Sequence, residues 1–94
     1  MTNSGTCSLM IALAVLKNRY DWQNGDEVIV PAVTFIATSN IVIRLNMKPV
    51  FVDVDPIYYE LDPEKIEEAI PNRTRCIIPV HLFGLPCDME RIRP

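Results

Sequence analysis

A turn, a short apolar strand and a proline follow one another in Gly25-Asp26-Glu27-Val28-Ile29-Val30-Pro31. Glycine and aspartate favour the turn, and the β-branched residues of 27–30 favour the strand. Two further apolar stretches of similar length follow at 49–54 and 75–81. The sequence therefore predicts three strands, and the residues between them decide how these strands pair.

Helices are predicted between the strands. Residues 7–20 are apolar on nearly every side, which predicts a buried helix. Residues 34–46 are expected to form a second helix that carries several large apolar side chains.

A third helix has the clearest local signals. Asp62 is a favourable N-cap, Pro63 suits the first helical position, and Leu61 can pack on Ile66. An apolar stripe is then expected at Ile66, Ala69 and Ile70. Asp88 is predicted to cap a fourth helix near the end of the sequence.

Strands recur about every two dozen residues with helices between them, which is typical of βαβ units and a parallel sheet. Apolar strands without alternation predict a sheet covered on both faces. We therefore expect an α/β fold, a partial three-layer sandwich with a mostly parallel sheet. The chain has 94 residues, 49% of them hydrophobic, and a mean hydropathy of +0.14. So small a domain hides little apolar surface, so residues 1–94 are interpreted as a piece of a larger domain, incomplete at both ends.

Composition argues against several classes of protein. A net charge of −3 and a pI of about 5.0 leave no basic stripe for nucleic acid. The apolar run 9–16 is too short to cross a membrane, and no secretory signal precedes it. Three widely spaced cysteines argue against a disulfide framework and predict a reduced, cytoplasmic location. One histidine and no close cysteine pair argue against zinc.

The junction Asn3-Ser4-Gly5-Thr6 precedes the first apolar helix. The first N–H groups of a helix lack acceptors within it, and the helix dipole favours an anion there. Gly5 permits close approach to the backbone, while Ser4 and Thr6 add hydroxyl donors. Two interpretations are open from these residues: a phosphate site, or an ordinary cap that serves only the helix.

Further candidates follow the predicted strands, because ligands of open α/β sheets bind beyond the carboxyl ends of the strands. Phe35 is interpreted either as a core residue or as a ring that stacks on a flat cofactor. Asp53 and Asp55 fit either acid–base catalysis or the capping of turns. His81 fits a hydrogen-bonded structural role or a catalytic one. These segments and the loop 4–7 are expected to line one crevice.

Six blocks of the sequence, in order and sensibly spaced, closely resemble the DegT/DnrJ/EryC1/StrS family of pyridoxal-phosphate-dependent sugar aminotransferases. The blocks are Asn3-Ser4-Gly5-Thr6, Gly25-Asp26-Glu27-Val28-Ile29-Val30-Pro31, Thr34-Phe35-Ile36-Ala37-Thr38, Pro49-Val50-Phe51-Val52-Asp53-Val54-Asp55, Asp62-Pro63-Glu64-Lys65-Ile66 and Pro79-Val80-His81-Leu82-Phe83-Gly84. The resemblance covers nearly the whole chain and implies part of the large domain of the type I, or aspartate aminotransferase, fold.

The resemblance also implies a cofactor and a reaction. It implies that Gly5, Thr6 and the backbone of Cys7 bind the phosphate of pyridoxal 5′-phosphate, and that Phe35 stacks on its ring. Members of the family transfer an amino group, usually from glutamate, to a keto sugar attached to a nucleotide. A homodimer is expected as well.

The family's Schiff-base lysine and the aspartate that pairs with the pyridine nitrogen lie downstream of the block ending in Gly84. None of Lys17, Lys48 and Lys65 follows the carboxyl end of a predicted strand, where such a lysine belongs. These 94 residues alone are therefore expected to be inactive. Two alternatives stay open: the sugar dehydratase branch of the same family, and a non-catalytic truncated product. A generic nucleotide-binding domain is disfavoured, because no full Gly-x-Gly-x-x-Gly pattern is present.

Overall fold

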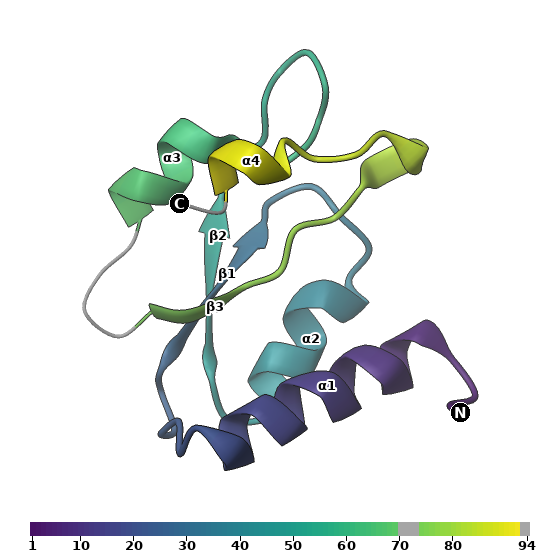
Figure 1. Cartoon of the computed structure of the whole chain (residues 1–94), viewed down its shortest axis with the longest axis vertical. Coiled ribbons are helices and arrows are strands. Elements are labelled where there is room, and N and C mark those ends of the chain that lie inside the picture. The colour runs from purple at the N-terminus through teal and green to yellow at the C-terminus, as the bar shows by residue number, and fades with distance from the viewer. Residues whose placement is uncertain (70–73, 93–94) are drawn as a thin grey trace.

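The computed structural model describes residues 1–69 and 74–92, in which helices and strands alternate (Figure 1). The elements are, in chain order, α1 (Gly5–Arg19), β1 (Glu27–Pro31), α2 (Ala37–Arg44), β2 (Lys48–Val52), α3 (Pro63–Ala69), β3 (Thr74–Ile77), the 3₁₀ turn η1 (Leu82–Gly84) and α4 (Met89–Ile92).

The three strands form one parallel sheet in the order β2-β1-β3. Ile29 at the middle of β1 pairs with Val50 on one side and with Ile77 on the other. Since the chain moves from β1 to β2 and then to the far side of β1, the loops leaving β1 and β3 diverge. In open α/β sheets, ligands bind where the loops at the carboxyl ends of neighbouring strands diverge in this way.

Helices cover both faces of the sheet. On one face Val28 and Val30 of β1 pack with Leu13 of α1 and with Ile41 and Val42 of α2. On the other face Ile29 belongs to a second cluster with Val52 of β2, Ile66 of α3 and Ile92 of α4. Leu61 and Cys87, from the segments that precede α3 and α4, complete this cluster. The predicted three-layer α/β arrangement with a parallel sheet is therefore confirmed.

Three predicted elements are shorter in the structure. The strand predicted at 49–54 is β2, which ends at Val52. The strand predicted at 75–81 is β3, which ends at Ile77. Ile78 still donates its N–H to the Ile29 carbonyl at 2.9 Å, but Pro79 has no N–H with which to continue. The helix predicted at 34–46 is α2, which begins at Ala37, because residues 32–36 form the loop that leaves β1.

The prediction that the first helix is buried is wrong. Within α1, Leu13 is the buried residue, whereas Leu9, Ile11, Val15 and Leu16 are exposed. The helix contacts α2 through one side, and the described part of the chain supplies no layer over its other sides. The apolar residues on every side of α1 therefore did not predict how much of the helix is buried by the described residues.

Polar side chains fix the ends of the elements. Asp62 Oδ1 accepts the N–H of Glu64 at 3.1 Å, and Asp88 Oδ1 accepts that of Arg91 at 3.3 Å, so both predicted caps are confirmed. Leu61 and Ile66 lie in one apolar cluster, as the predicted staple requires. Ile66 of the predicted stripe is buried, while Ile70 lies outside the described residues.

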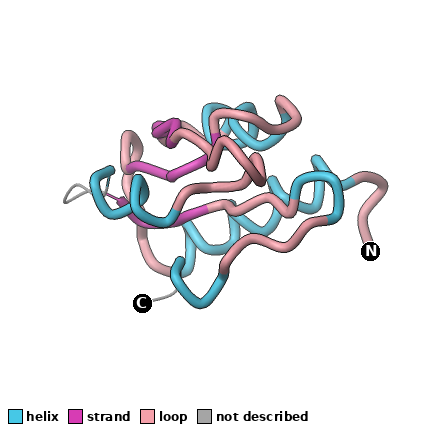
Figure 2. Tube along the Cα trace, turned by 90° about the horizontal axis from the view of Figure 1, so that it is seen from above, coloured by secondary structure: helices cyan, strands magenta, loops and turns pink. Residues whose placement is uncertain are grey.

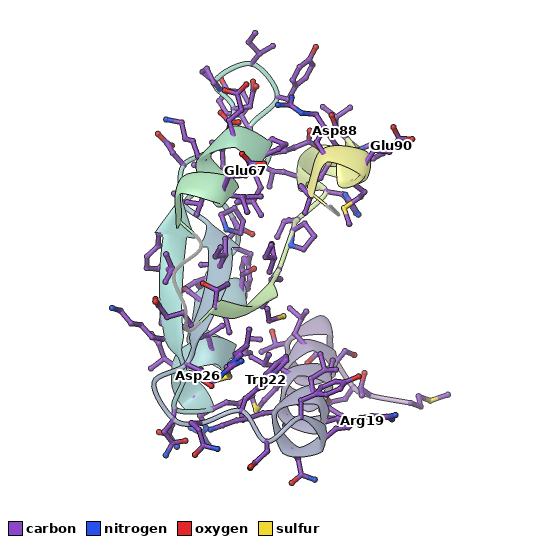
Figure 3. The ribbon with its side chains drawn as sticks, turned by 60° about the vertical axis from the view of Figure 1, so that its left-hand side comes forward. Arg19, Trp22, Asp26, Glu67, Asp88 and Glu90 are labelled. Carbon is purple, nitrogen blue, oxygen red and sulfur yellow. The ribbon has the colours of Figure 1, made fainter. Side chains whose placement is uncertain are left out.

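A buried carboxylate ties the beginning of β1 to the beginning of β3. Asp26, 2% exposed, accepts the N–H of Gln23 at 2.9 Å and Nε of Arg75 at 3.1 Å. Figure 3 shows Asp26 and Trp22 at one end of the sheet, with Glu67 and Asp88 at the other. The amino ends of the strands are therefore fixed by an ion pair, opposite the end where ligands bind in such folds.

None of the described helices has the length and apolar character that a membrane span requires. The three cysteines, Cys7, Cys76 and Cys87, are free thiols.

Candidate functional site

Ser4 caps the start of α1. Its backbone is extended (φ −162°, ψ 162°), and its Oγ accepts the N–H of Cys7 at 3.2 Å. The N–H and the hydroxyl of Ser8 both donate to the Ser4 carbonyl at 3.1 Å. The cap interpretation of this junction is thus confirmed. A cap does not exclude a ligand, because the N–H groups of Gly5 and Thr6 precede the first residue that can find an acceptor within the helix.

The start of α1 is open and suited to an anion. Gly5 and Thr6 are exposed, Cys7 is half-buried, and a Cβ added at Gly5 would meet nothing within 4 Å. No acidic residue lies in the first turn of this 15-residue helix. In the two views of Figures 1 and 2 the N-terminal residues lie well to one side of the strands. Aligned peptide dipoles and free N–H groups therefore face open space, as a phosphate site needs.

Phe35 lies at the surface, so the core interpretation of this residue is wrong. It is 74% exposed and immediately precedes Ile36, the N-cap residue of α2. The side chains that α2 contributes to the core are instead Ile41 and Val42. An exposed ring in the loop leaving β1 has a free face that a flat ring system can cover.

Helices α1 and α2 begin at the same end of the molecule. Nζ of Lys17, near the end of α1, donates to the Leu45 carbonyl at the end of α2 at 2.7 Å. Because both helices rise by about 1.5 Å per residue, the residues nine positions earlier, Ser8 and Ile36, lie at a similar level. Figure 1 shows both helices starting on the right-hand side. The open start of α1 and Phe35 therefore share one end of the α1–α2 pair.

The other predicted candidates have structural partners. Oδ1 of Asp55 accepts the N–H groups of Ile57 and Tyr58 at 2.8 and 3.1 Å, and Oδ1 of Asp53 accepts that of Val54 at 2.9 Å. His81 Nδ1 accepts the N–H of Cys87 at 2.9 Å. Turn capping is thus confirmed for Asp55, and the hydrogen-bonded interpretation of His81 is confirmed; Asp53 contacts only the N–H of its neighbour, so turn capping by Asp53 stays a prediction.

One polar group that the sequence did not indicate is buried Glu60. It is 7% exposed, and its Oε2 has no hydrogen-bond partner among the described residues. In the sequence it lies between tyrosines and the Asp62 cap, a context that gives no signal of burial.

The parallel three-layer arrangement corresponds to part of the type I fold of pyridoxal-phosphate-dependent aminotransferases. The structure of NtdA from Bacillus subtilis with bound pyridoxamine phosphate superposes with a TM-score of 0.87 at 47% sequence identity, over 96% of this chain and 20% of that one. The model of the DegT/DnrJ/EryC1/StrS aminotransferase family matches residues 1–94. The chain belongs to this family.

Curated relatives match along almost the whole chain. The UDP-N-acetyl-3-dehydro-α-D-glucosamine 3-aminotransferase of Acidithiobacillus ferrooxidans is 53% identical over 89 residues, 95% of this chain and 23% of the relative. The 3-oxo-glucose-6-phosphate:glutamate aminotransferase of B. subtilis is 47% identical over 92 residues, 98% of this chain and 20% of the relative. The chain therefore spans about a fifth of the length of these proteins.

Proposed function

We propose that the intact protein is a pyridoxal 5′-phosphate-dependent aminotransferase that acts on a nucleotide-linked keto sugar, with glutamate as amino donor. Residues 1–94 form part of its cofactor-binding large domain. The observation that carries the proposal is the capped, open helix start at Gly5 and Thr6, which lies at the same end of the α1–α2 pair as exposed Phe35.

In this proposal the chain binds and orients the cofactor. The N–H groups of Gly5 and Thr6 and the Thr6 hydroxyl hold its phosphate. The N–H of Cys7, which donates to Ser4 Oγ at 3.2 Å, joins them by sharing that hydrogen bond with the phosphate. The Phe35 ring covers one face of the pyridine ring. When bound, pyridoxal 5′-phosphate supplies the electron-accepting ring that amino-group transfer requires.

The names of the relatives support the choice of substrate and donor. One relative is named for a UDP-linked 3-dehydro sugar, and another for a 3-oxo sugar phosphate and glutamate. A keto sugar is common to both names, and the nucleotide is taken from the relative of higher identity. A homodimer is proposed for the intact protein, as the family resemblance implies.

A Thr6→Asp variant tests the phosphate site. A carboxylate in the first turn interacts favourably with the helix dipole, by roughly 0.3–1 kcal/mol, but repels a phosphate. We expect pyridoxal 5′-phosphate to bind the intact variant at least tenfold more weakly while its Tm does not fall, measured by absorbance titration and thermal melting. Asn46→Asp adds the same charge at the end of α2 and should leave affinity unchanged. Equal affinity in Thr6→Asp and wild type would contradict the assignment.

The reaction itself is tested with UDP- and GDP-linked keto sugars, glutamate and the cofactor. Release of 2-oxoglutarate that depends on the sugar is expected. Loss of water from the sugar without glutamate consumption would favour the dehydratase alternative. Neither reaction, in a protein that binds the cofactor, would favour the non-catalytic one.

A further inference from the structure

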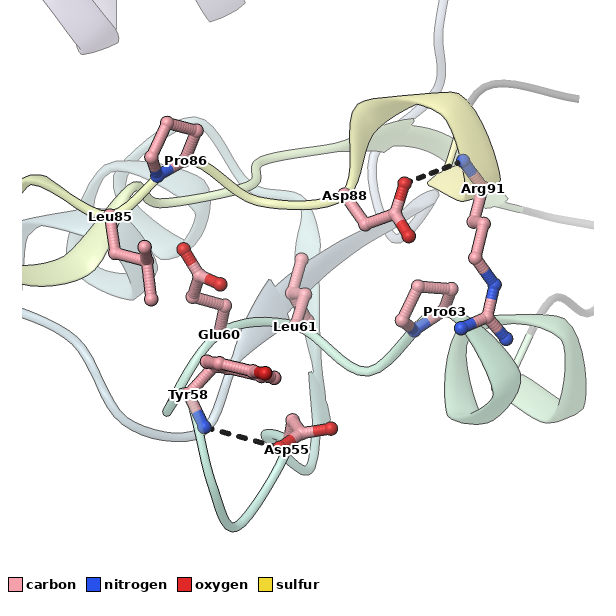
Figure 4. A pocket seen from close by; sticks show the side chains of 9 residues that line it. All are labelled: Asp55, Tyr58, Glu60, Leu61, Pro63, Leu85, Pro86, Asp88 and Arg91. Atoms are coloured by element: carbon pink, nitrogen blue, oxygen red, sulfur yellow. Dashed lines mark hydrogen bonds between the residues drawn. The ribbon is translucent and has the colours of Figure 1, made fainter.

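A cavity of about 260 Å³ lies on the other face of the sheet from α1, between the loop that follows β2 and the segment leading into α4. Leu61, Pro63, Leu85 and Pro86 supply apolar walls, and Tyr58 adds an aromatic ring. Figure 4 shows the Glu60 side chain directed into the space between Leu85 and Leu61. The cavity thus has apolar walls beside the Glu60 carboxylate, and charged side chains complete its lining.

Glu60 is the unusual member of this lining. The residue is 7% exposed, and Oε2 accepts no hydrogen bond from the described residues. An ionised carboxylate is an acceptor only, and a buried one is strongly disfavoured unless a donor or a cation pairs with it. The cavity therefore lacks a group that brings N–H or O–H donors to Oε2.

The charge around Glu60 favours a cation. Asp55 and Asp88 also line the cavity, against the single guanidinium of Arg91. Each aspartate already accepts backbone N–H groups through Oδ1, and Arg91 Nη2 lies 3.5 Å from Glu64 Oε1, outside the lining. The three carboxylates thus outnumber the one cation, and an anionic ligand would meet net repulsion.

We propose that this cavity binds a small organic cation, a primary ammonium or guanidinium group whose N–H donors pair with Glu60 Oε2. The apolar walls accept an alkyl stem, and the Tyr58 ring offers a face to the positive charge. Such a headgroup is carried either by a free amine or by a lysine or arginine of the intact protein. The site is separate from the proposed cofactor site.

The test uses the intact protein, its Glu60→Gln variant, and Glu67→Gln as the matched control. Glu67 is an exposed acid of α3 that is absent from the lining. The probes are n-butylammonium and methylguanidinium chlorides, with 1-butanol as the neutral comparator. We expect saturable binding of a cation by calorimetry, at least tenfold weaker in Glu60→Gln and unchanged in Glu67→Gln, and no saturable binding of 1-butanol.

If a side chain of the protein itself supplies the cation, free cations will not bind the wild type. Glu60→Gln will then melt at a lower temperature than Glu67→Gln. Glu60→Met, which keeps the volume but removes both oxygens, will also melt lower. The proposal is overturned if cations bind Glu60→Gln as well as wild type. It is equally overturned if no cation binds and both Glu60 variants melt at or above the wild-type temperature, since the carboxylate would then be unpaired.

Discussion

The exposure of Phe35 is determined by its place in the fold rather than by its residue type. Phenylalanine is usually a core residue, yet this ring is 74% exposed because residues 32–36 leave the sheet before α2 begins. Exposure means that the ring contributes little to the stability of the described fold. Removal of the ring should therefore weaken ligand binding without lowering the stability of the fold.

Phe35→Ala is expected to weaken the binding of pyridoxal 5′-phosphate by about two- to tenfold, since an aromatic pair contributes roughly 0.5–1.5 kcal/mol. Phe35→Tyr should bind normally, and neither variant should change Tm. Phe51→Ala, which removes another exposed phenylalanine from β2, is the control. A large fall in Tm for Phe35→Ala would instead show that the ring packs in the intact protein. Absorbance titration and melting together distinguish these outcomes.

Two thiols link stability to pH. Burial raises the pKa of Cys76, and burial together with the nearby Glu60 carboxylate raises the pKa of Cys87. The unfolded chain loses these protons at lower pH, near the reference pKa of about 8.5. It then binds fewer protons than the folded chain, so stability is complete below that pH and is lost as the pH rises through the folded pKa values.

Urea denaturation at pH 7.5 and pH 9.5 should therefore give a lower free energy of unfolding at the higher pH. Cys76→Ser and Cys87→Ser should each reduce this difference. If the difference is the same in all variants, other groups cause it.

At the scale of elements, the α3 and α4 caps were predictable because each depends on residues within a few positions of the helix start. Their signals are local: Asp62 before Pro63, and Asp88 before Met89. The end of β3 and the exposure of α1 were not predicted. The first depends on Pro79 together with its partner strand, and the second on what lies against the helix.

Asp26 joins two elements that are far apart in the chain. Asp26→Asn keeps the shape of the side chain but removes the charge that Arg75 Nε contacts. We expect the free energy of unfolding to fall by about 1–3 kcal/mol, the usual effect of disrupting a buried charged hydrogen bond. Asp21→Asn is the control, because Asp21 is exposed and asparagine tolerates its φ of 54°. Equal stability of the two variants would contradict this role.

For the whole molecule, the alternation of apolar strands and helices was enough to predict a parallel sheet covered on both faces. The capped, exposed start of α1 could also be predicted, since it needs only Ser4, Gly5 and Thr6 before an apolar helix, whereas phosphate binding there stays a proposal. The cavity around Glu60 could not. It forms where the loop 55–60 lies next to Leu85, Pro86 and Arg91. These residues are distant in the sequence, so no local pattern predicts the cavity.

The central position of β1 has a consequence for the order in which the sheet assembles. Ile29 meets Val50 only 21 positions later in the chain but meets Ile77 48 positions later. Closing the shorter loop costs less entropy, and the residues that close it leave the ribosome first. We expect amides of β1 and β2 to gain protection before those of β3 in pulse-labelled hydrogen exchange during refolding. Simultaneous protection of all three strands would instead mean that the sheet forms in one step.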